Sequence, residues 1–313
     1  MPTVTTPFSV TAPSGAVLQG SIQRPIPVPF RPRPRAAVVL LPGGVGAGRR
    51  MARSPGGTRL AEAGMVVVSF NAEGRSSGKL GDRRSGGTLD FNGARDQDGL
   101  AVVIRHVLEL SDVDPDRLGL CSISFGLVAA TGCMARHPDL PVRYLVDEEG
   151  PADGYSAMLQ GWRLVDLGER PDRAQKALDL FGHACPGEGS PSSASASAFW
   201  GERLPLRDIA AFRGRYLRLQ AEWDHVQPPQ EPAHVPLFRQ PPRWWQGRHA
   251  MQLVNAAVAA GLPWVRVNLP AQGNAVGATY DPVHPPRWIP GRMADHRDVW
   301  VDGVLEMAGM DPS

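Results

Sequence analysis

The chain has 313 residues, enough to bury a full hydrophobic core, and its hydrophobic fraction of 42% and charged fraction of 20% are ordinary for a globular protein. The net charge of +2, from 33 basic and 31 acidic residues, gives no reason to expect a nucleic acid or a membrane surface as partner. Neither a secretory leader nor a long apolar run is evident, and the odd number of cysteines argues against a disulfide framework. We therefore expect a soluble, cytoplasmic protein.

Short apolar runs alternate with helical patterns in the first half of the chain. The runs are rich in β-branched or aliphatic residues and end at glycine or another turn former, as buried parallel strands do; they cover 36–41, 65–70, 118–121 and 142–146. Helical patterns cover 58–63 and 96–110, the second with acidic residues in its first turn, as the helix dipole prefers. This alternation predicts an α/β fold with right-handed crossovers and helices on both faces of a parallel sheet.

Further elements are expected towards the two ends of the chain. Two more strands, 216–220 and 264–268, follow a long interruption, and an amphipathic stretch at 298–307 predicts the last helix. Near the start, 8–10 and 17–22 resemble a hairpin, which we expect at the edge of the sheet.

The segment 151–212 departs from this alternation. It contains a predicted helix at 173–181 and a Gly/Ser/Ala-rich tract at 187–198, which has too little apolar surface to order itself. We interpret 151–212 as a lid-like insertion between two parts of one core, 1–150 and 213–313. The alternative is a surface excursion with no role in substrate choice. The proline-rich segments 24–35 and 228–242 are predicted to be connecting loops.

The strongest local motif is Ser-Ile-Ser-Phe-Gly at 122–126, between a predicted strand and a predicted helix. A nucleophile elbow needs small residues two positions before and after the nucleophile, because strand and helix approach closely there. Ser124 meets this requirement, whereas Ser122 and Cys121 each have a bulky residue at a flanking position. The turn would present the hydroxyl at a helix N-terminus, where N–H groups stabilise negative charge. Ser124 is therefore predicted to be a nucleophile, with a helix-capping serine as the alternative.

At this point the chain resembles the α/β-hydrolase family, nearest to its dienelactone-hydrolase and acyl-peptidase-like branches. The resemblance covers most of 15–313, weakly through 151–212, and rests on the Gly-rich turn at 40–46, a second turn at 70–78, the Ser124 elbow and the segment 219–228. It implies the α/β-hydrolase fold, a mostly parallel central sheet with helices on both faces and an insertion after the sixth strand.

The resemblance also assigns roles to individual residues. Gly44 or Val45 would donate one oxyanion-hole N–H from the first Gly-rich turn, and Phe125 would donate the other. Asp224 would be the acid of a catalytic triad. Apart from the resemblance, Arg75 and Ser76 in the second turn are expected to hold loops together; contact of Arg75 with a carboxylate substrate is the alternative.

Asp224 also has support from its position, because a carboxylate just past a parallel strand lies at the edge where such sheets bind ligands. There it could fix the tautomer of a histidine and stabilise the imidazolium. The alternative is a turn-forming aspartate. A competing acidic run, 147–149, ends the preceding strand; it is most often a solvated turn, and otherwise Glu149 is the alternative acid.

The base is harder to assign, since 269–274 follows the last strand without a histidine and Asn274 stands near the expected place. His296 precedes the last predicted helix and agrees with the chain order Ser, Asp, His, so it is the preferred base. His284 is the alternative base, and a chain without a catalytic histidine is also considered. His225, beside the proposed acid, is expected to be a surface residue.

Together these residues predict acyl transfer to water from a small-molecule ester, thioester or lactone, through an acyl-enzyme on Ser124. No metal or organic cofactor is implied, and a homodimer is compatible with the sequence. The alternatives are an acyltransferase or peptidase on the same fold, and a catalytically silent α/β-hydrolase-fold binding protein.

Overall fold

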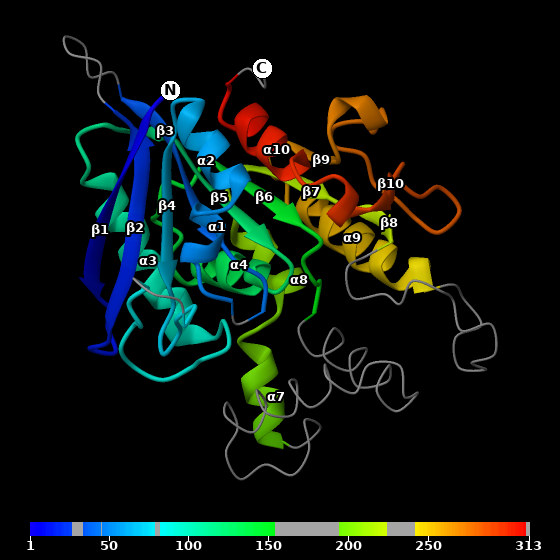
Figure 1. Ribbon diagram of the computed structural model, residues 1–313. Coiled ribbons are helices and arrows are strands. Elements are labelled where there is room, and N and C mark those ends of the chain that lie inside the picture. Colours follow the sequence, from blue (N-terminus) through cyan, green and yellow to red (C-terminus); the bar gives the residue numbers. More distant parts are fainter. Residues whose placement is uncertain (27–33, 45, 79–81, 154–193, 224–241, 311–313) are drawn as a thin grey trace.

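The computed structural model describes residues 1–26, 34–44, 46–78, 82–153, 194–223 and 242–310 (Figure 1). Within these ranges, eight strands form one sheet in the order β1-β2-β4-β3-β5-β6-β7-β9. They are β1 (Thr3–Thr11), β2 (Val17–Pro25), β3 (Arg35–Leu41), β4 (Val66–Asn71), β5 (Val113–Ile123), β6 (Tyr144–Glu148), β7 (Arg215–Leu219) and β9 (Val265–Val267). Two short strands, β8 (Ala221–Trp223) and β10 (Ile289–Arg292), form a separate parallel pair.

The sheet is parallel from β4 to β9 and antiparallel at one edge. β1 and β2 form the predicted edge hairpin, and β2 is also antiparallel to β4. The remaining neighbours all pair in parallel. The mostly parallel sheet predicted from the apolar runs is thus confirmed. The carboxyl ends of its parallel strands meet at one edge, where the Gly-rich turn and Ser124 follow strands and the acidic run 147–149 ends one.

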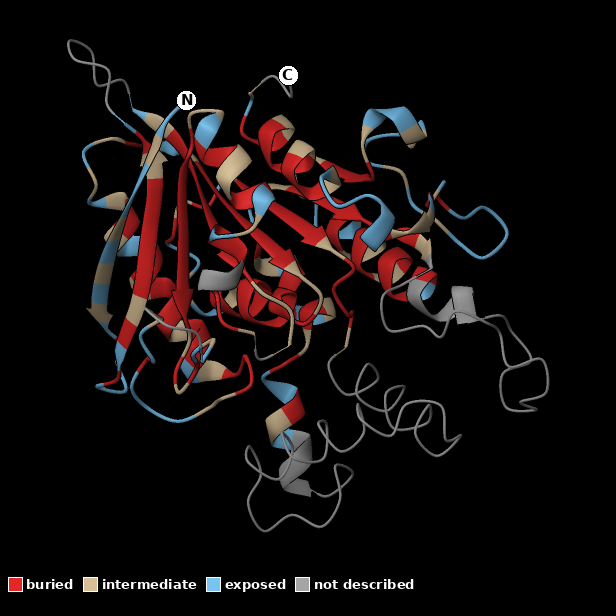
Figure 2. Cartoon of the chain, viewed as in Figure 1, coloured by how far each residue is buried: buried red, intermediate tan, exposed pale blue. Residues whose placement is uncertain are grey.

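Helices cover both faces of the sheet, as predicted (Figure 2). Along β3, side chains alternate between the faces: Val38 and Leu40 join one buried cluster, and Val39 and Leu41 join the other. The first cluster includes α1 (Arg49–Ala52), α2 (Pro55–Glu62) and α10 (Val299–Met307), and the second includes α3 (Ala94–Leu108), α4 (Gly126–Arg136), α8 (Pro205–Asp208) and α9 (Pro242–Ala259). Short 3-10 turns are η1 (Ile209–Ala211), η2 (Pro270–Gln272) and η3 (Met293–Asp295).

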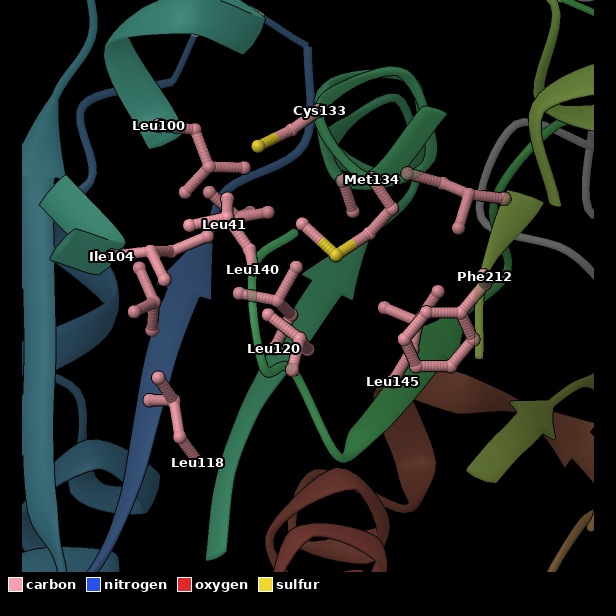
Figure 3. Close-up of a cluster of buried hydrophobic side chains, with 14 of the residues drawn as sticks. Leu41, Leu100, Ile104, Leu118, Leu120, Cys133, Met134, Leu140, Leu145 and Phe212 are labelled. Atoms are coloured by element: carbon pink, nitrogen blue, oxygen red, sulfur yellow. The ribbon is translucent and has the colours of Figure 1, made fainter. Parts of the chain in front are cut away.

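The cluster under α3 and α4 is made of hydrophobic side chains, most of them aliphatic, from strands and helices (Figure 3). Leu118 and Leu120 of β5 and Leu145 of β6 meet Leu100 and Ile104 of α3 there, and all five are completely buried. Burying a side chain of this size stabilises the fold by about 1.5–3 kcal/mol relative to leaving it in water. This packing fixes α3 and α4 against the strand that leads into Ser124.

Helix α9 was not predicted, because the proline-rich segment ahead of it was interpreted as part of a loop. Pro242 begins the helix, a position where its missing N–H costs nothing. Ala250, Leu253, Val254 and Ala257 are buried at helical spacing, which is the sequence signal that was overlooked. No helix in the described part of the chain is both long and apolar enough to cross a membrane.

The segment 151–212, predicted to be an insertion, is described at 151–153 and from residue 194 onwards, so its predicted helix at 173–181 lies outside the described residues. Helix α7 (Ala194–Gly201) includes the last residues of the Gly/Ser/Ala-rich tract, which was expected to have too little apolar surface to order itself. Alanine is the best helix former. Contacts of the helix end supply the missing stability: the Phe199 ring stacks on Phe91 with centroids 6.5 Å apart, and the Arg203 guanidinium lies 3.5 Å from the Phe199 centroid.

Replacing Ile104 by alanine should lower the free energy of unfolding by about 2–5 kcal/mol, because it opens a cavity that close-packed neighbours fill only partly. Urea unfolding followed by circular dichroism measures this change. Val283→Ala, at a side chain that is 79% exposed, is the matched control and should leave the midpoint unchanged. Equal midpoints for the two variants would contradict the packing described.

Candidate active site

Ser124 lies in a strained turn between the end of β5 and the start of α4. Its φ of +51° is in the left-handed region, which residues other than glycine seldom adopt. The backbone is held there by two hydrogen bonds: the Ser124 N–H donates to the Glu148 carbonyl of β6 at 2.7 Å, and the Leu127 N–H donates to the Ser124 carbonyl at 3.1 Å. Strain of this kind persists only when the surroundings enforce it, and it concentrates at functional sites.

Glycines make this turn sterically feasible. A Cβ at Gly126 would lie 2.8 Å from the carbonyl oxygens of both Leu41 and Pro42, so helix α4 could not approach β3 as it does. A Cβ at Gly43 would lie 3.1 Å from the Ser124 Cβ and 3.7 Å from its Oγ. The Gly-rich turn after β3 and the proposed nucleophile are therefore direct neighbours.

The residues predicted for the oxyanion hole surround this turn, apart from Val45, which lies outside the described residues. Gly44 has a φ of +58°, a conformation for which glycine has no steric penalty. Phe125 is buried and directly precedes α4, where helix N–H groups lack intrahelical partners. N–H groups at such a position can stabilise a developing oxyanion.

A buried polar group links the two turns. The Asn92 Nδ2 donates to the Gly44 carbonyl at 3.1 Å and to the Phe125 carbonyl at 3.0 Å. Arg75 donates to Asn92 Oδ1 at 2.9 Å, to the Gly44 carbonyl at 3.4 Å and to the Asp96 carboxylate. Arg75 thus holds loops together, as expected. Asn92 and Asp96 were missed, although Asn92-Gly93 is a turn signal at the start of a helical pattern.

A narrow cavity lies directly beneath these two turns. Pro42 and Gly126 line it on the side of the elbow, and Arg75, Asn92 and Asp96 line it on the side of α3. The buried polar cluster therefore shares a cavity with residues of the Gly-rich turn and of the start of α4.

Asp224, the predicted acid, lies outside the described residues. The last described residue before it is Trp223, at the end of β8. The alternative acid, Glu149, is buried with a φ of +53°. Its Oε1 accepts from the Ala221 N–H at 3.3 Å and from the Gln220 Nε2 at 3.4 Å. Its own N–H donates to the Leu219 carbonyl at 3.0 Å. The interpretation of 147–149 as a solvated turn was therefore wrong.

An ion pair explains why this acidic run can be buried. Arg218 Nη1 lies 2.7 Å from Asp147 Oδ2, and both side chains are completely inaccessible to solvent. Tyr216 donates to the same carboxylate oxygen at 2.7 Å, and burial, then the Asp147 charge, raise the pKa of its phenol, so it remains a donor. Arg218 Nη2 donates to Gln220 Oε1 at 2.6 Å, which orients the amide that faces Glu149. The overlooked sequence signal for this burial was Arg218, because a charged residue within an apolar strand needs a buried partner of opposite charge.

Both candidate bases lie at the surface. His296 is exposed and its Nε2 lies 2.8 Å from the Pro290 carbonyl. The side chain of His284 is 82% exposed, and its Nδ1 lies 3.3 Å from Asp281. Asn274, which stands near the expected place of the base, instead joins loop segments through the Arg287 backbone. His225 lies outside the described residues.

The segment that leads to His296 is nevertheless tied to the strand that leads to Asp224. β10 pairs in parallel with β8, with Ile289 opposite Ala221 and Arg292 opposite Trp223. The Gly291 N–H also donates to the Glu222 carboxylate at 3.2 Å. The chain therefore enters the His296 turn beside the last described residue before Asp224.

Two other potentially reactive side chains are buried. His249 of α9, which was missed, accepts the Ala152 N–H at Nδ1 over 3.0 Å, which places the ring proton on Nε2. Burial, then the charges of Glu148 and Asp147, raise the pKa of the Cys121 thiol, so the reactive thiolate is disfavoured beside the elbow. Among the residues with described positions, no three His, Cys, Asp or Glu side chains gather as metal ligands would.

No protein-family model and no curated protein sequence matches this chain. Solved structures do. An esterase of Rhizomucor miehei matches with a TM-score of 0.59 and 15% identity, over 99% of this chain and 84% of the esterase. The acylaminoacyl peptidase of Pyrococcus horikoshii matches with a TM-score of 0.56 and 14% identity, over 97% of this chain and 40% of the peptidase. Together with the strand order, these matches decide the architecture. The chain has the α/β-hydrolase fold.

A third structure, dipeptidyl peptidase 4 of Porphyromonas gingivalis, matches with a TM-score of 0.53 and 16% identity, over 83% of this chain. The chain spans only 31% of that protein. At such identities the likeness establishes the α/β-hydrolase fold. In that fold the nucleophile occupies a sharp turn between a strand and a helix, at the carboxyl edge of the sheet. Ser124 occupies such a turn.

Gly126→Ala should destabilise the elbow, because the added Cβ would meet two backbone oxygens that cannot rotate away. We expect a lower melting temperature, equivalent to about 1–3 kcal/mol of overpacking, and slower labelling of Ser124 by a fluorophosphonate probe. Gly201→Ala is the control, since no atom lies within 4 Å of the Cβ it would add. If both variants melt and label like the wild type, the close approach at the elbow is incorrect.

Proposed function

We propose that this protein is a serine hydrolase that cleaves a small carboxylic ester, thioester or lactone through an acyl-enzyme on Ser124. The left-handed backbone of Ser124, enclosed by Gly43 and Gly126, carries this proposal. A hydrolase gains from such strain because it presents the hydroxyl at a helix N-terminus, whereas a serine that only caps a helix has extended backbone.

The proposed reaction has two halves. Ser124 Oγ attacks the carbonyl carbon while His296 accepts the hydroxyl proton, and Asp224 orients the imidazole. The negative charge on the carbonyl oxygen is stabilised by the N–H groups of Phe125 and of Gly44 or Val45. The imidazolium then protonates the leaving alcohol or thiol. In the second half, water attacks the acyl carbon while His296 accepts its proton; the bond between that carbon and Ser124 Oγ then breaks, the imidazolium returns the proton to Oγ, and the carboxylic acid is released.

The assignment of His296 is supported by the β8–β10 pairing, which joins its segment to the one preceding Asp224. In the described arrangement, His296 Nε2 donates to the Pro290 carbonyl, because a carbonyl can only accept. The proposed mechanism therefore requires the ring to leave Pro290 before Nε2 can accept a proton. Glu149 is the alternative acid, since it is buried beside the end of β7 and its orientation is fixed by Gln220.

An ester is proposed rather than a peptide because of the leaving group. An amine must be protonated as it leaves, which demands a well-placed general acid, whereas an alcohol or thiol departs more readily. The exposed position of His296 suits the less demanding substrate. Hydrolysis of matched p-nitrophenyl esters and p-nitroanilides separates the two classes, and product analysis with added alcohols and amines separates hydrolysis from acyl transfer.

One alternative from another class has an observation in its favour. Both His284 and His296 are exposed and engaged in other contacts, as expected for an α/β-hydrolase-fold protein that binds ligands without catalysis. Such a protein would keep the strained serine but lack its activating base. A fluorophosphonate probe distinguishes the two, because labelling at Ser124 requires an activated hydroxyl.

Ser124→Ala should abolish hydrolysis of short-chain p-nitrophenyl esters, with a loss in kcat on the order of 10³ or more, because no other group replaces the nucleophile. Stopped assays at saturating ester measure it. Ser122→Ala is the matched control: that hydroxyl is buried in β5 and lies 3.5 Å from the Val146 carbonyl, so activity should persist. Undiminished hydrolysis by Ser124→Ala would remove Ser124 from the mechanism.

His296→Ala should lower kcat for the same esters by about 10²-fold or more, which is the loss expected when a general base is removed. His284→Ala should leave kcat near wild type, because that side chain is exposed and paired with Asp281. Comparing the two variants at one pH above neutrality measures the difference. A loss confined to His284→Ala would reassign the base, and no loss in either would exclude both histidines.

A further inference from the structure

The loop that leads into α3 has an unusual backbone. Phe91 and Asn92 both have positive φ values, +52° and +61°, and both side chains are buried. Asparagine tolerates this region, whereas for a bulky phenylalanine it is a marked outlier. Two successive residues in such a conformation need many contacts to hold them.

Asn92 is fixed by several different partners. Its N–H donates to Asp96 at 2.8 Å, and its Oδ1 accepts from Arg75 at 2.9 Å. Its carbonyl accepts from Gln97 Nε2 at 3.1 Å. The Nδ2 group bridges the carbonyls of Gly44 and Phe125, to which it donates at 3.1 and 3.0 Å.

We propose that Asn92 is a positioning residue for the oxyanion hole. This inference rests on the proposed hydrolase function and adds a component to it. Each carbonyl that Asn92 holds belongs to a turn from which an oxyanion N–H is expected, one in the Gly-rich turn and one at the start of α4. A planar peptide unit joins each carbonyl to the N–H of the next residue, so holding the Phe125 carbonyl fixes the Gly126 N–H beside the expected donor, and holding the Gly44 carbonyl restricts the peptide unit that leaves Gly44. One amide group therefore sets the two turns relative to each other.

The far side of the loop is anchored by the end of the insertion. Arg203, almost completely buried, donates from Nε to the Phe91 carbonyl at 3.0 Å. Gln97 Nε2, which binds the Asn92 carbonyl, also donates to the Glu202 carbonyl at 2.8 Å. The Phe91 ring packs on the Phe125 ring, with centroids 4.6 Å apart. Asn92 is thus held rigidly enough to hold other groups, as preorganised stabilisation of a transition state requires.

Asn92→Asp tests this role directly. The aspartate has nearly the same shape, tolerates positive φ and can still accept from Arg75, but an ionised carboxylate donates to neither carbonyl. Above neutral pH we expect kcat for p-nitrophenyl esters to fall about 10- to 100-fold, less than for removal of an oxyanion donor itself. The KM should change little, because the two hydrogen bonds that Nδ2 donates act mainly on stabilisation of the transition state.

Asn255→Asp in α9 is the matched control. The Asn255 side chain also donates to a backbone carbonyl, that of Tyr280 at 2.7 Å, and accepts the Tyr280 N–H, but it contacts neither turn. It should keep the wild-type kcat. If Asn92→Asp does not fold, as judged by its melting curve, Asn92→Gly keeps the positive φ while removing both donated bonds, and the same loss is expected.

The outcomes separate this inference from the proposed function. A drop in kcat at constant KM, in Asn92→Asp or Asn92→Gly but not in Asn255→Asp, supports the positioning role. A wild-type kcat in a folded Asn92 variant, with Ser124→Ala inactive, overturns the positioning role and leaves the hydrolase function standing. A rise in KM without a loss of kcat in the Asn92 variants also overturns the positioning role. If the wild type shows no Ser124-dependent hydrolysis, the proposed function is overturned, and this inference with it.

Discussion

The left-handed backbone at Ser124 has to be enforced by its neighbours, because an isolated serine would relax to a more common conformation. Three elements do this. The adjacent strand β6 accepts the Ser124 N–H through Glu148, and helix α4 packs closely on the end of β3 where only Gly126 fits. The core beneath α3 and α4 holds that helix in place. The candidate site therefore depends on the packing of the sheet and its helices, not on the motif alone.

The carboxyl edge of the sheet concentrates charge in a dry environment. Asp147 and Arg218 form a completely buried pair, and Gln220 connects Arg218 to Glu149. Removing one member of such a pair costs about 3–5 kcal/mol, since the remaining charge stays buried without compensation. A second buried pair, Arg75 and Asp96, is joined to the Gly-rich turn through the Gly44 carbonyl. Both ion pairs fix loops that follow strands, so the polar residues of this edge order the backbone around Ser124.

Much of this arrangement could be predicted from local patterns. The apolar runs ending in turn formers marked the strands, because burial in a parallel sheet leaves continuous hydrophobic segments. The small residues around Ser124 marked the elbow, since steric limits there act over a few residues. Helix α9 had a readable pattern of buried positions, but the prolines before it favoured a loop interpretation. The roles of Asn92, Arg218 and Gln220 were not predicted, because each of them also binds a partner that is far away in the sequence.

By itself, then, the sequence determined most of the strands and helices, the parallel sheet and the serine in its tight turn. These properties depend on backbone sterics and on the burial of neighbouring side chains, which short segments specify. Only the tertiary structure decided that the acidic run is buried against Arg218, that Asn92 joins two turns and that His284 and His296 lie at the surface. Each of these depends on contacts between strand ends and loops that the sheet brings together, and no local pattern records such distances.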